Sequence, residues 1–120
     1  MLRWMEFTVE FYETTAGRLP VEEFLLKLKA SDPDDFAAVM AGIAKLRHRQ
    51  YHREPLNKAL SGGLFELRHI GKLNTRVLWF FRKGRRIVAV HGIRNKALAI
   101  PARDLDTARE RMRDWKKRNE

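Results

Sequence analysis

The sequence predicts an α+β fold, a single compact domain with an antiparallel or at most mixed β-sheet. Three observations predict this class. The 120 residues are enough for one domain with a substantial core. Strand periodicity occurs near the N-terminus and in three segments of the second half, and helical periodicity occupies the region between them and the C-terminal end. The expected order is β-α-α-β-β-β-α within one domain of residues 1–120.

The first expected element is a strand in WMEFTVEFYE, residues 4–13, because its side chains alternate between two faces. This alternation is typical of a half-buried strand. One face carries Trp4, Glu6, Thr8 and Glu10, and the other carries Met5, Phe7, Val9 and Phe11.

Two helices are expected next. The first begins at Pro20, with acidic side chains in its first turn. The second has Asp32 as its N-cap and Pro33 as its first residue. Both have an apolar face at helical spacing, which predicts that they pack on a core. These faces are Val21, Phe24, Leu25 and Leu28 in the first helix, and Phe36, Val39, Met40, Ile43 and Leu46 in the second.

Three strands and a final helix are expected after the glycines of KALSGG. The strands are residues 64–69, 75–81 and 86–93, joined by glycine-containing connections of hairpin length, so they form an antiparallel meander. Pro101 begins the last helix, which ends in a basic turn. Its apolar face is Leu105, Ala108, Met112 and Trp115, and the tryptophans Trp4, Trp79 and Trp115 are expected in the core.

The net charge of +10 lies entirely in the second half of the chain. Residues 1–60 hold nine Lys or Arg and nine Asp or Glu, whereas residues 61–120 hold sixteen and six. This asymmetry favours a polyanionic partner, usually nucleic acid, over a basic surface that serves solubility alone. The basic segment Lys45 to Arg53 has two interpretations, contact with RNA phosphates or a solvated helix end.

Several classes of protein are excluded or disfavoured. The chain has no cysteine, which excludes disulfides, thiolate zinc sites and a cysteine nucleophile. His48 and His52 are four residues apart, but the glutamate of the zinc-protease motif is missing, so we expect no metal and no cofactor. The first residues include glutamates and no continuous apolar run, so we expect a cytoplasmic protein with no membrane partner.

The strand region from residue 63 to residue 96 holds nine Lys or Arg and one acid, Glu66. Alternation places Glu66 and Arg68 on one face of their strand, with Arg76 on the next strand. A buried guanidinium group is costly without a partner. Two interpretations follow for Arg68 and Arg76. Their guanidinium groups either bind a phosphate together, each through two hydrogen bonds, or form ion pairs with Glu66 or with a glutamate of the first strand.

A set of motifs runs through this region: KAL, GLFELR, a strand with an arginine, the basic turn RKGRR, HGIRNK, and a proline before an arginine-rich helix. This pattern resembles the RelE/HigB superfamily of toxins, above all its phage-derived, HigB-like branch. The likeness spans nearly the whole chain. The matching positions are Lys58, Leu60, Gly63, Leu64, Phe65, Glu66, Leu67, Arg68, Arg76, His91, Gly92, Lys96, Pro101 and Ala108.

The resemblance implies a RelE-like fold and the toxin of a type II toxin–antitoxin system. Such a toxin is a metal-independent endoribonuclease that cleaves mRNA on the ribosome and is silenced by a cognate antitoxin, a small helix-turn-helix protein. Attack of a ribose 2′-OH on its own 3′-phosphate needs a base, charge stabilisation and a proton donor. The expected catalytic residues are Arg68, Arg76, Arg94, Lys96, Glu66 and His91, and the expected RNA-binding residues are Lys58, Arg82, Lys83, Arg85 and Arg86.

The chain also departs from the pattern of this branch. Thr75 stands where the branch has tyrosine, and residues 93–96 read Ile-Arg-Asn-Lys in place of Phe-x-Lys-Lys. The general base is therefore open between His91 and Glu66, and strict alternation places His91 with Ile87, Ala89 and Ile93 on a core face. We expect Arg68, Arg76 and the Arg94/Lys96 pair to converge on one phosphate. The alternatives are a non-catalytic RNA- or ribosome-binding module, or a phage accessory protein whose basic face binds an acidic protein.

Overall fold

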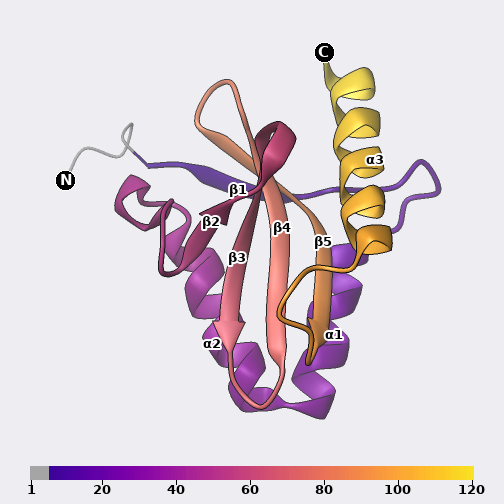
Figure 1. The fold of residues 1–120 in the computed structure, drawn as a ribbon. Helices are drawn as coiled ribbons and strands as arrows, with labels where there is room; N and C mark the ends of the chain where they lie inside the picture. The colour runs from indigo at the N-terminus through magenta and orange to yellow at the C-terminus, as the bar shows by residue number, and fades with distance from the viewer. Residues whose placement is uncertain (1–5) are drawn as a thin grey trace.

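The computed structural model describes residues 6–120 and shows a five-stranded sheet with three α-helices (Figure 1). The sheet order is β1-β5-β4-β3-β2, with β1 parallel to β5 and every other pair antiparallel. The strands are β1 (Thr8–Phe11), β2 (Asn57–Ala59), β3 (Leu64–Ile70), β4 (Asn74–Arg82) and β5 (Arg86–Asn95). The helices are α1 (Pro20–Ser31), α2 (Pro33–Lys45) and α3 (Ala102–Asn119), and short 3-10 turns lie at Arg49–Tyr51 and Ser61–Gly63.

The predicted α+β class is confirmed, and so is the order of elements apart from one strand. The sheet, predicted to be antiparallel or at most mixed, is mixed because β1 runs parallel to β5. The missed strand is β2, which pairs with residues 65–67 of β3 through only three residues. A run of three residues is too short to show alternation. The helix boundaries agree closely: the Asp32 carboxylate caps α2 by accepting from the Asp35 backbone N–H at 3.2 Å, and α3 begins one residue after Pro101.

The sheet has a core on each face. One core joins α1 and α2 to the sheet and contains Trp79, and the other joins α3 to the opposite face and contains Trp115. The indole N–H of Trp79 donates to the buried Asn57 amide oxygen at 2.9 Å. Both tryptophans therefore lie in the core as predicted, whereas Trp4 lies outside the described residues.

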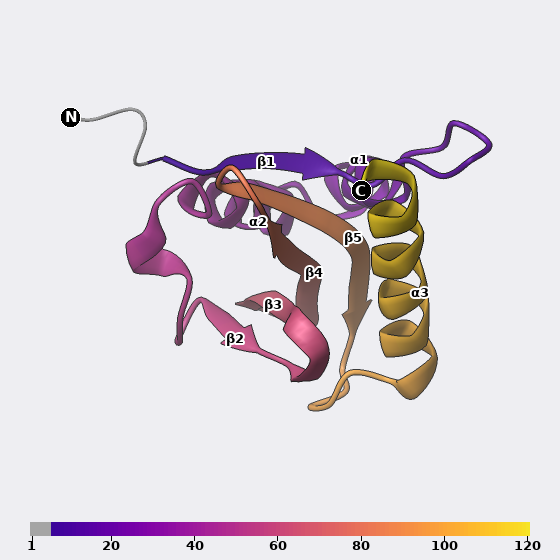
Figure 2. The same ribbon diagram turned by 90° about the horizontal axis from the view of Figure 1, so that it is seen from above.

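The helix α3 covers only part of its face of the sheet. It packs mainly against β5 and β4, at the side of the sheet away from β2, as both ribbon views show (Figures 1 and 2). The strands β2 and β3 are therefore left beside the segment from residue 96 to residue 101 instead of beneath the helix. No helix in residues 6–120 has the length and apolar character needed to cross a lipid bilayer.

A β-bulge in β5 changes which side chains face each core. Leu78 of β4 lies opposite His91, but the next residue, Trp79, lies opposite Ala89, so Val90 is an extra residue in β5. Ala89 packs in the α1/α2 core, whereas the His91 side chain contacts α3. The prediction that His91 shares a face with Ile87 and Ala89 is therefore wrong, because a bulge breaks the two-residue period.

Candidate functional site

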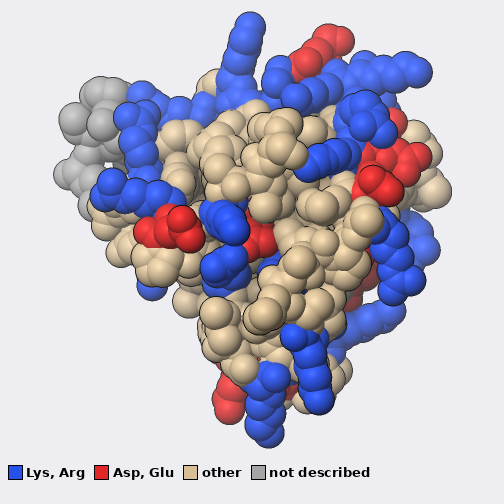
Figure 3. Space-filling model, viewed as in Figure 1, with Lys and Arg blue, Asp and Glu red and all other residues tan. Residues whose placement is uncertain are grey.

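A groove of about 290 Å³ lies over β2 and β3, on the part of the sheet that α3 leaves uncovered. The β-strands supply Lys58, Glu66 and Arg68, and α3 supplies Arg109. In Figure 3, basic and acidic atoms lie side by side over these two strands, near the centre of the view. We call this cavity the β2–β3 groove; its other lining residues are Leu60, Ser61, Leu98, Ala99, Ile100 and Leu105.

Two arginines flank the Glu66 carboxylate in this groove. Arg68 donates from Nε and Nη2 to Glu66 Oε1 at 2.9 and 2.6 Å, and Glu66 Oε2 lies 3.7 Å from Arg76 Nε. The two arginines are direct partners in the β3–β4 ladder, so their side chains share one face. The ion-pair alternative from the sequence is therefore the one that the structure shows, with Glu66 only 2% exposed.

Arg76 is buried, and protein groups accept hydrogen bonds from both terminal nitrogens of its guanidinium. Its Nη2 donates to the carbonyl oxygens of Ala97 and Leu98 at 2.9 and 2.8 Å, and the residue is 4% exposed. Its Nη1 lies 3.4 Å from the Asn95 amide oxygen. Arg76 thus fastens the segment after β5 to the sheet and places Leu98 at the groove. Arg68 is the member of the pair that is half-exposed.

Arg94 lies on the opposite face of the sheet. It pairs with Thr75, and its Nη2 donates to Asp32 at 2.7 Å and to Asp35 at 3.0 Å. The expected convergence with Arg68 and Arg76 is therefore wrong for Arg94. The Arg94 guanidinium holds the pKa of Asp35 below its ordinary value, and a hydrogen bond from His69 at 3.0 Å acts in the same direction. Lys96 is exposed in the segment after β5.

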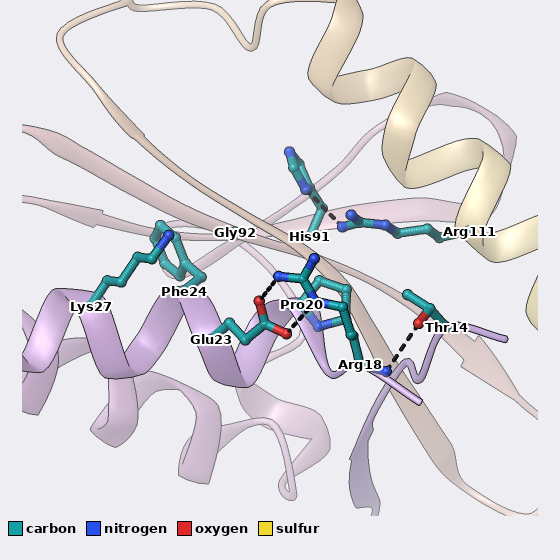
Figure 4. Close-up of a pocket in the computed structure, with 9 residues that line it drawn as sticks. All are labelled: Thr14, Arg18, Pro20, Glu23, Phe24, Lys27, His91, Gly92 and Arg111. Atoms are coloured by element: carbon teal, nitrogen blue, oxygen red, sulfur yellow. Dashed lines mark hydrogen bonds and ion pairs between the residues drawn. The ribbon is translucent and has the colours of Figure 1, made fainter. Parts of the chain in front are cut away.

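His91 lines a different cavity, of about 300 Å³, between α1, β5 and α3 (Figure 4). Arg111 Nη1 lies 3.0 Å from His91 Nδ1, and His91 Nε2 lies 2.8 Å from Asp104 Oδ1. Arginine has only donors, so Nδ1 accepts and Nε2 carries the proton that is donated to Asp104. Burial lowers the pKa of Arg111. This cavity shares no lining residue with the β2–β3 groove, so the structure does not bring His91 and Glu66 to one cavity.

The hairpin between β4 and β5 forms a separate basic edge. Basic side chains gather along the top of Figure 3, over this hairpin and the end of α3. Arg82 forms an ion pair with Glu120, and Arg86 makes two hydrogen bonds to Glu10 at 2.9 and 3.0 Å. Lys83 is exposed at the tip, and Arg85 has a left-handed backbone with φ of 57°. Acidic partners therefore already engage two of the four predicted RNA-binding residues of the hairpin.

Sequence reasoning missed Arg109 and Leu98 as groove residues. Arg109 Nη2 donates to the Ser61 hydroxyl at 2.9 Å, which links α3 to the turn before β3. Its spacing of four from Leu105 was a usable signal, because residues four apart share a helix face. Leu98 is 94% exposed and gave no signal.

Among residues 6–120 no group of three His, Asp or Glu side chains is placed to hold a metal ion. The His52 ring lies among Phe7, Trp79 and Phe81, with Nε2 near the Leu46 carbonyl oxygen. Burial lowers the pKa of His52, which fits a neutral ring in the core.

These features define a basic α+β domain with a groove above an Arg–Glu–Arg cluster, in which Glu66 and Arg76 are buried and Arg68 is partly exposed. A family model described as phage-derived protein Gp49-like (DUF891) matches residues 23–113, from α1 to the last turns of α3. The chain belongs to this family, which is associated with RelE-like toxins of toxin–antitoxin systems. No curated protein matches the chain.

Proposed function

We propose that the protein is the toxin of a type II toxin–antitoxin system, a RelE/HigB-like endoribonuclease that cleaves mRNA on the ribosome. Membership of the Gp49-like family supports a toxin. The observation that carries the nuclease part is the Glu66–Arg68 pair, a carboxylate and a guanidinium held together on a strand at an open basic groove. The proposal includes a RelE-like fold and one toxin domain over residues 1–120.

The groove residues can perform each step of the proposed cleavage without a metal ion. The ribose 2′-oxygen attacks phosphorus, the bond to the 5′-oxygen breaks, and a 2′,3′-cyclic phosphate and a 5′-hydroxyl form. Glu66 takes the 2′-hydroxyl proton at Oε2, which lies beyond hydrogen-bond distance of Arg76. Arg68 donates to the non-bridging oxygens as their charge grows, and Lys58, opposite Glu66 in the ladder, protonates the leaving oxygen.

The other predicted residues take supporting positions in this proposal. Arg76 is a positioning residue that holds Glu66 and the segment carrying Leu98. Lys96 and the hairpin residue Lys83 are exposed cations that contact RNA or ribosome phosphates. Arg94 has no part in the chemistry, because it is committed to Asp32 and Asp35. His91 has none either, since it faces the second cavity.

The proposed protein partner is a cognate antitoxin, a small helix-turn-helix protein with an acidic segment that covers the β2–β3 groove. The support is charge: the groove lining holds three cations, Lys58, Arg68 and Arg109, and one carboxylate. An acidic segment would occupy the position of the RNA phosphates, so inhibition and substrate binding would exclude each other.

A non-catalytic RNA- or ribosome-binding module is the second candidate. The observation in its favour is that two of the predicted catalytic residues face away from the groove and that Arg76 is buried in its own hydrogen bonds. A module of this kind would bind RNA through Lys58, Arg68 and Arg109 and leave it intact.

The test is expression of the intact chain in a bacterial host, followed by mapping of RNA 5′ ends. We expect growth arrest and new 5′-hydroxyl ends with the wild type. Loss of one donor to a developing oxyanion lowers the rate by about a hundredfold or more, so Arg68→Ala should abolish arrest. Loss of the general base costs a comparable factor, so Glu66→Gln should abolish it too. His91→Ala should remain active.

Arg113→Ala is the matched control, because Arg113 is an exposed arginine on α3 outside the groove. Cleavage that survives both Arg68→Ala and Glu66→Gln would contradict the proposed site. Tight RNA binding by purified wild-type protein with no new 5′ ends would favour the binding module.

A further inference from the structure

A cavity of about 430 Å³ lies beside β3, next to the β2–β3 groove. The strand β2 pairs with β3 only up to Leu67, so the edge of β3 from Arg68 to Ile70 has no strand partner. The Arg68 backbone N–H donates instead to the Leu56 carbonyl at 3.0 Å. The segment from residue 50 to residue 56 forms the other wall, and we call this cavity the β3-edge pocket.

The lining of the β3-edge pocket combines flat apolar surfaces with cations. Tyr51, Pro55 and Ile70 line it, and Ile70 is 72% exposed. The Lys45 ammonium lies 5.3 Å from the centre of the Tyr51 ring. The Asn57 side chain donates to the Tyr51 carbonyl at 2.7 Å, so the backbone that carries the ring is fixed to β2.

Arg68 connects this pocket with the β2–β3 groove, because its side chain lines both cavities. A phosphate held by Arg68 therefore has the β3-edge pocket on one side. Aromatic side chains beside cations that track the backbone are the usual means of binding single-stranded nucleic acid. Three cations, Lys45, Arg53 and Arg68, line the pocket together with one acid, Glu54, which favours a polyanion over an apolar peptide.

The basic segment from Lys45 to Arg53 can now be divided. Arg47 forms an ion pair with Glu6, and Arg49 lies 5.9 Å from the Phe7 ring centre. These two cations are engaged away from the pocket, whereas Lys45, Tyr51 and Arg53 face it. The segment is thus neither a uniform phosphate clamp nor a simple solvated helix end.

We propose that the β3-edge pocket binds one nucleobase of the RNA strand, stacked on Tyr51, next to the phosphate held by Arg68. This inference rests on the proposed action of the β2–β3 groove on RNA. It makes Tyr51 a residue that selects where the strand is held, with the exposed Gln50 and Arg53 close enough to contact base edges. Contacts at this base would set the sequence context of cleavage.

The experiment is a double-mutant cycle in RNA affinity, in which Tyr51→Ala in the protein is combined with removal of one base from the RNA. The probe is a short RNA oligonucleotide with 2′-O-methyl riboses, which cannot be cleaved, and with one abasic position moved along the strand. Its affinity for the wild type and for Tyr51→Ala is measured by fluorescence anisotropy. At one position we expect base removal to weaken wild-type binding about tenfold, Tyr51→Ala to weaken binding equally, and both together to cause no further loss.

Matched variants separate stacking from folding and from charge. Tyr51→Phe keeps the ring and should bind like the wild type, whereas Arg68→Ala should weaken binding at every sequence and reduce its salt dependence. Tyr51→Ala should leave the salt dependence unchanged.

Two results would overturn the inference alone. The first is that the losses of affinity from base removal and from Tyr51→Ala add at every position of the RNA, while Arg68→Ala still weakens binding. The RNA would then lie at the groove without a base in the pocket. The second is a shift of the Tyr51 ring signals in NMR spectra with an acidic leucine-containing peptide but not with the RNA, which would assign the pocket to a protein partner. RNA affinity that is independent of Arg68 would instead refute the proposed function.

Discussion

At the scale of single residues, Arg76 shows why the charge of a strand residue does not by itself identify a ligand contact. The sequence places Arg68 and Arg76 side by side correctly, and the structure gives them different roles. Arg68 keeps a half-exposed guanidinium at the groove, whereas Arg76 is buried under the carbonyl oxygens of Ala97 and Leu98. The difference comes from residues after β5, which the strand pattern does not include.

This difference predicts unequal effects on stability. Removing one partner of a buried ion pair costs about 3–5 kcal/mol, so Arg76→Ala should lower the free energy of unfolding by about that amount. Arg68→Ala removes hydrogen bonds to a charged group from a half-exposed position and should cost about 2 kcal/mol. Urea unfolding of both variants measures the two values. Equal stabilities for Arg76→Ala and the wild type would show that Arg76 is free to bind a ligand.

At the scale of elements, an ionic cluster joins the start of α2 to the sheet. Asp32 and Asp35 at the first turn of α2 accept hydrogen bonds from Arg94 of β5, and Asp35 also contacts His69 of β3. His69 and Arg94 both lie opposite or next to Thr75 in the sheet, close to the hairpin that joins β3 and β4. The cluster therefore fixes the start of α2 to β3 and β5, whose contacting residues lie 34 to 62 positions further along the chain.

The cluster predicts a pH dependence of stability. Arg94 lowers the pKa of Asp35 from its ordinary 3.8, so the folded state holds the ionised form more strongly than the unfolded state. This stability is present above the ordinary value and is lost as the pH falls through the lower folded value. Asp35→Asn should therefore be less stable than the wild type at pH 7, and the gap should shrink below about pH 4.

Urea unfolding at several pH values measures this gap, and Asp34→Asn is the control because Asp34 is exposed in the same turn of α2. A gap between Asp35→Asn and the wild type that stays constant from pH 7 to pH 3 would show that Arg94 does not stabilise the ionised carboxylate.

The positions of the helices and strands were largely predictable from the sequence. Which face of the sheet each side chain of β5 points to was not. Pro33 and Asp32 mark the start of α2 by local chemistry, and the apolar faces of the three helices pack as their spacing predicts, except that Met40 of α2 is exposed. The bulge at Val90 depends on the register in which β5 pairs with β4, and no residue pattern within β5 itself indicates it. It reverses the faces of His91 and Arg94, so the structure brings Glu66, Arg68 and Lys58 together at one groove and leaves His91 and Arg94 outside it. The catalytic and RNA-binding roles of these residues stay predictions.

At the scale of the whole molecule, the positive charge is divided between the groove and the hairpin edge. Arg82 and Arg86 have acidic partners, so their removal would also release Glu120 and Glu10. Lys83 at the tip is the simpler probe. Lys83→Gln should weaken binding to RNA of any sequence, without changing the cleavage rate of bound RNA. The slope of the logarithm of the binding constant against the logarithm of the salt concentration should fall in magnitude by about 1.

The measurement is RNA affinity over a range of salt concentrations, with single-turnover cleavage at saturating protein. Arg113→Gln serves as the control on the exposed side of α3. A loss of single-turnover cleavage in Lys83→Gln would move the hairpin tip into the active site.

The position of β1 also has a consequence for how the chain is made. This strand pairs only with β5, and its first residue, Thr8, lies opposite Arg86. During synthesis β1 is made before β5, and it has no partner until the whole segment between Phe11 and Arg86 has been made. Pairing of such distant segments is slow because the loop between them must close first. The helical hairpin of α1 and α2 can form early, but the sheet, and any binding that depends on it, is complete only after β5 has been made and has paired with β1.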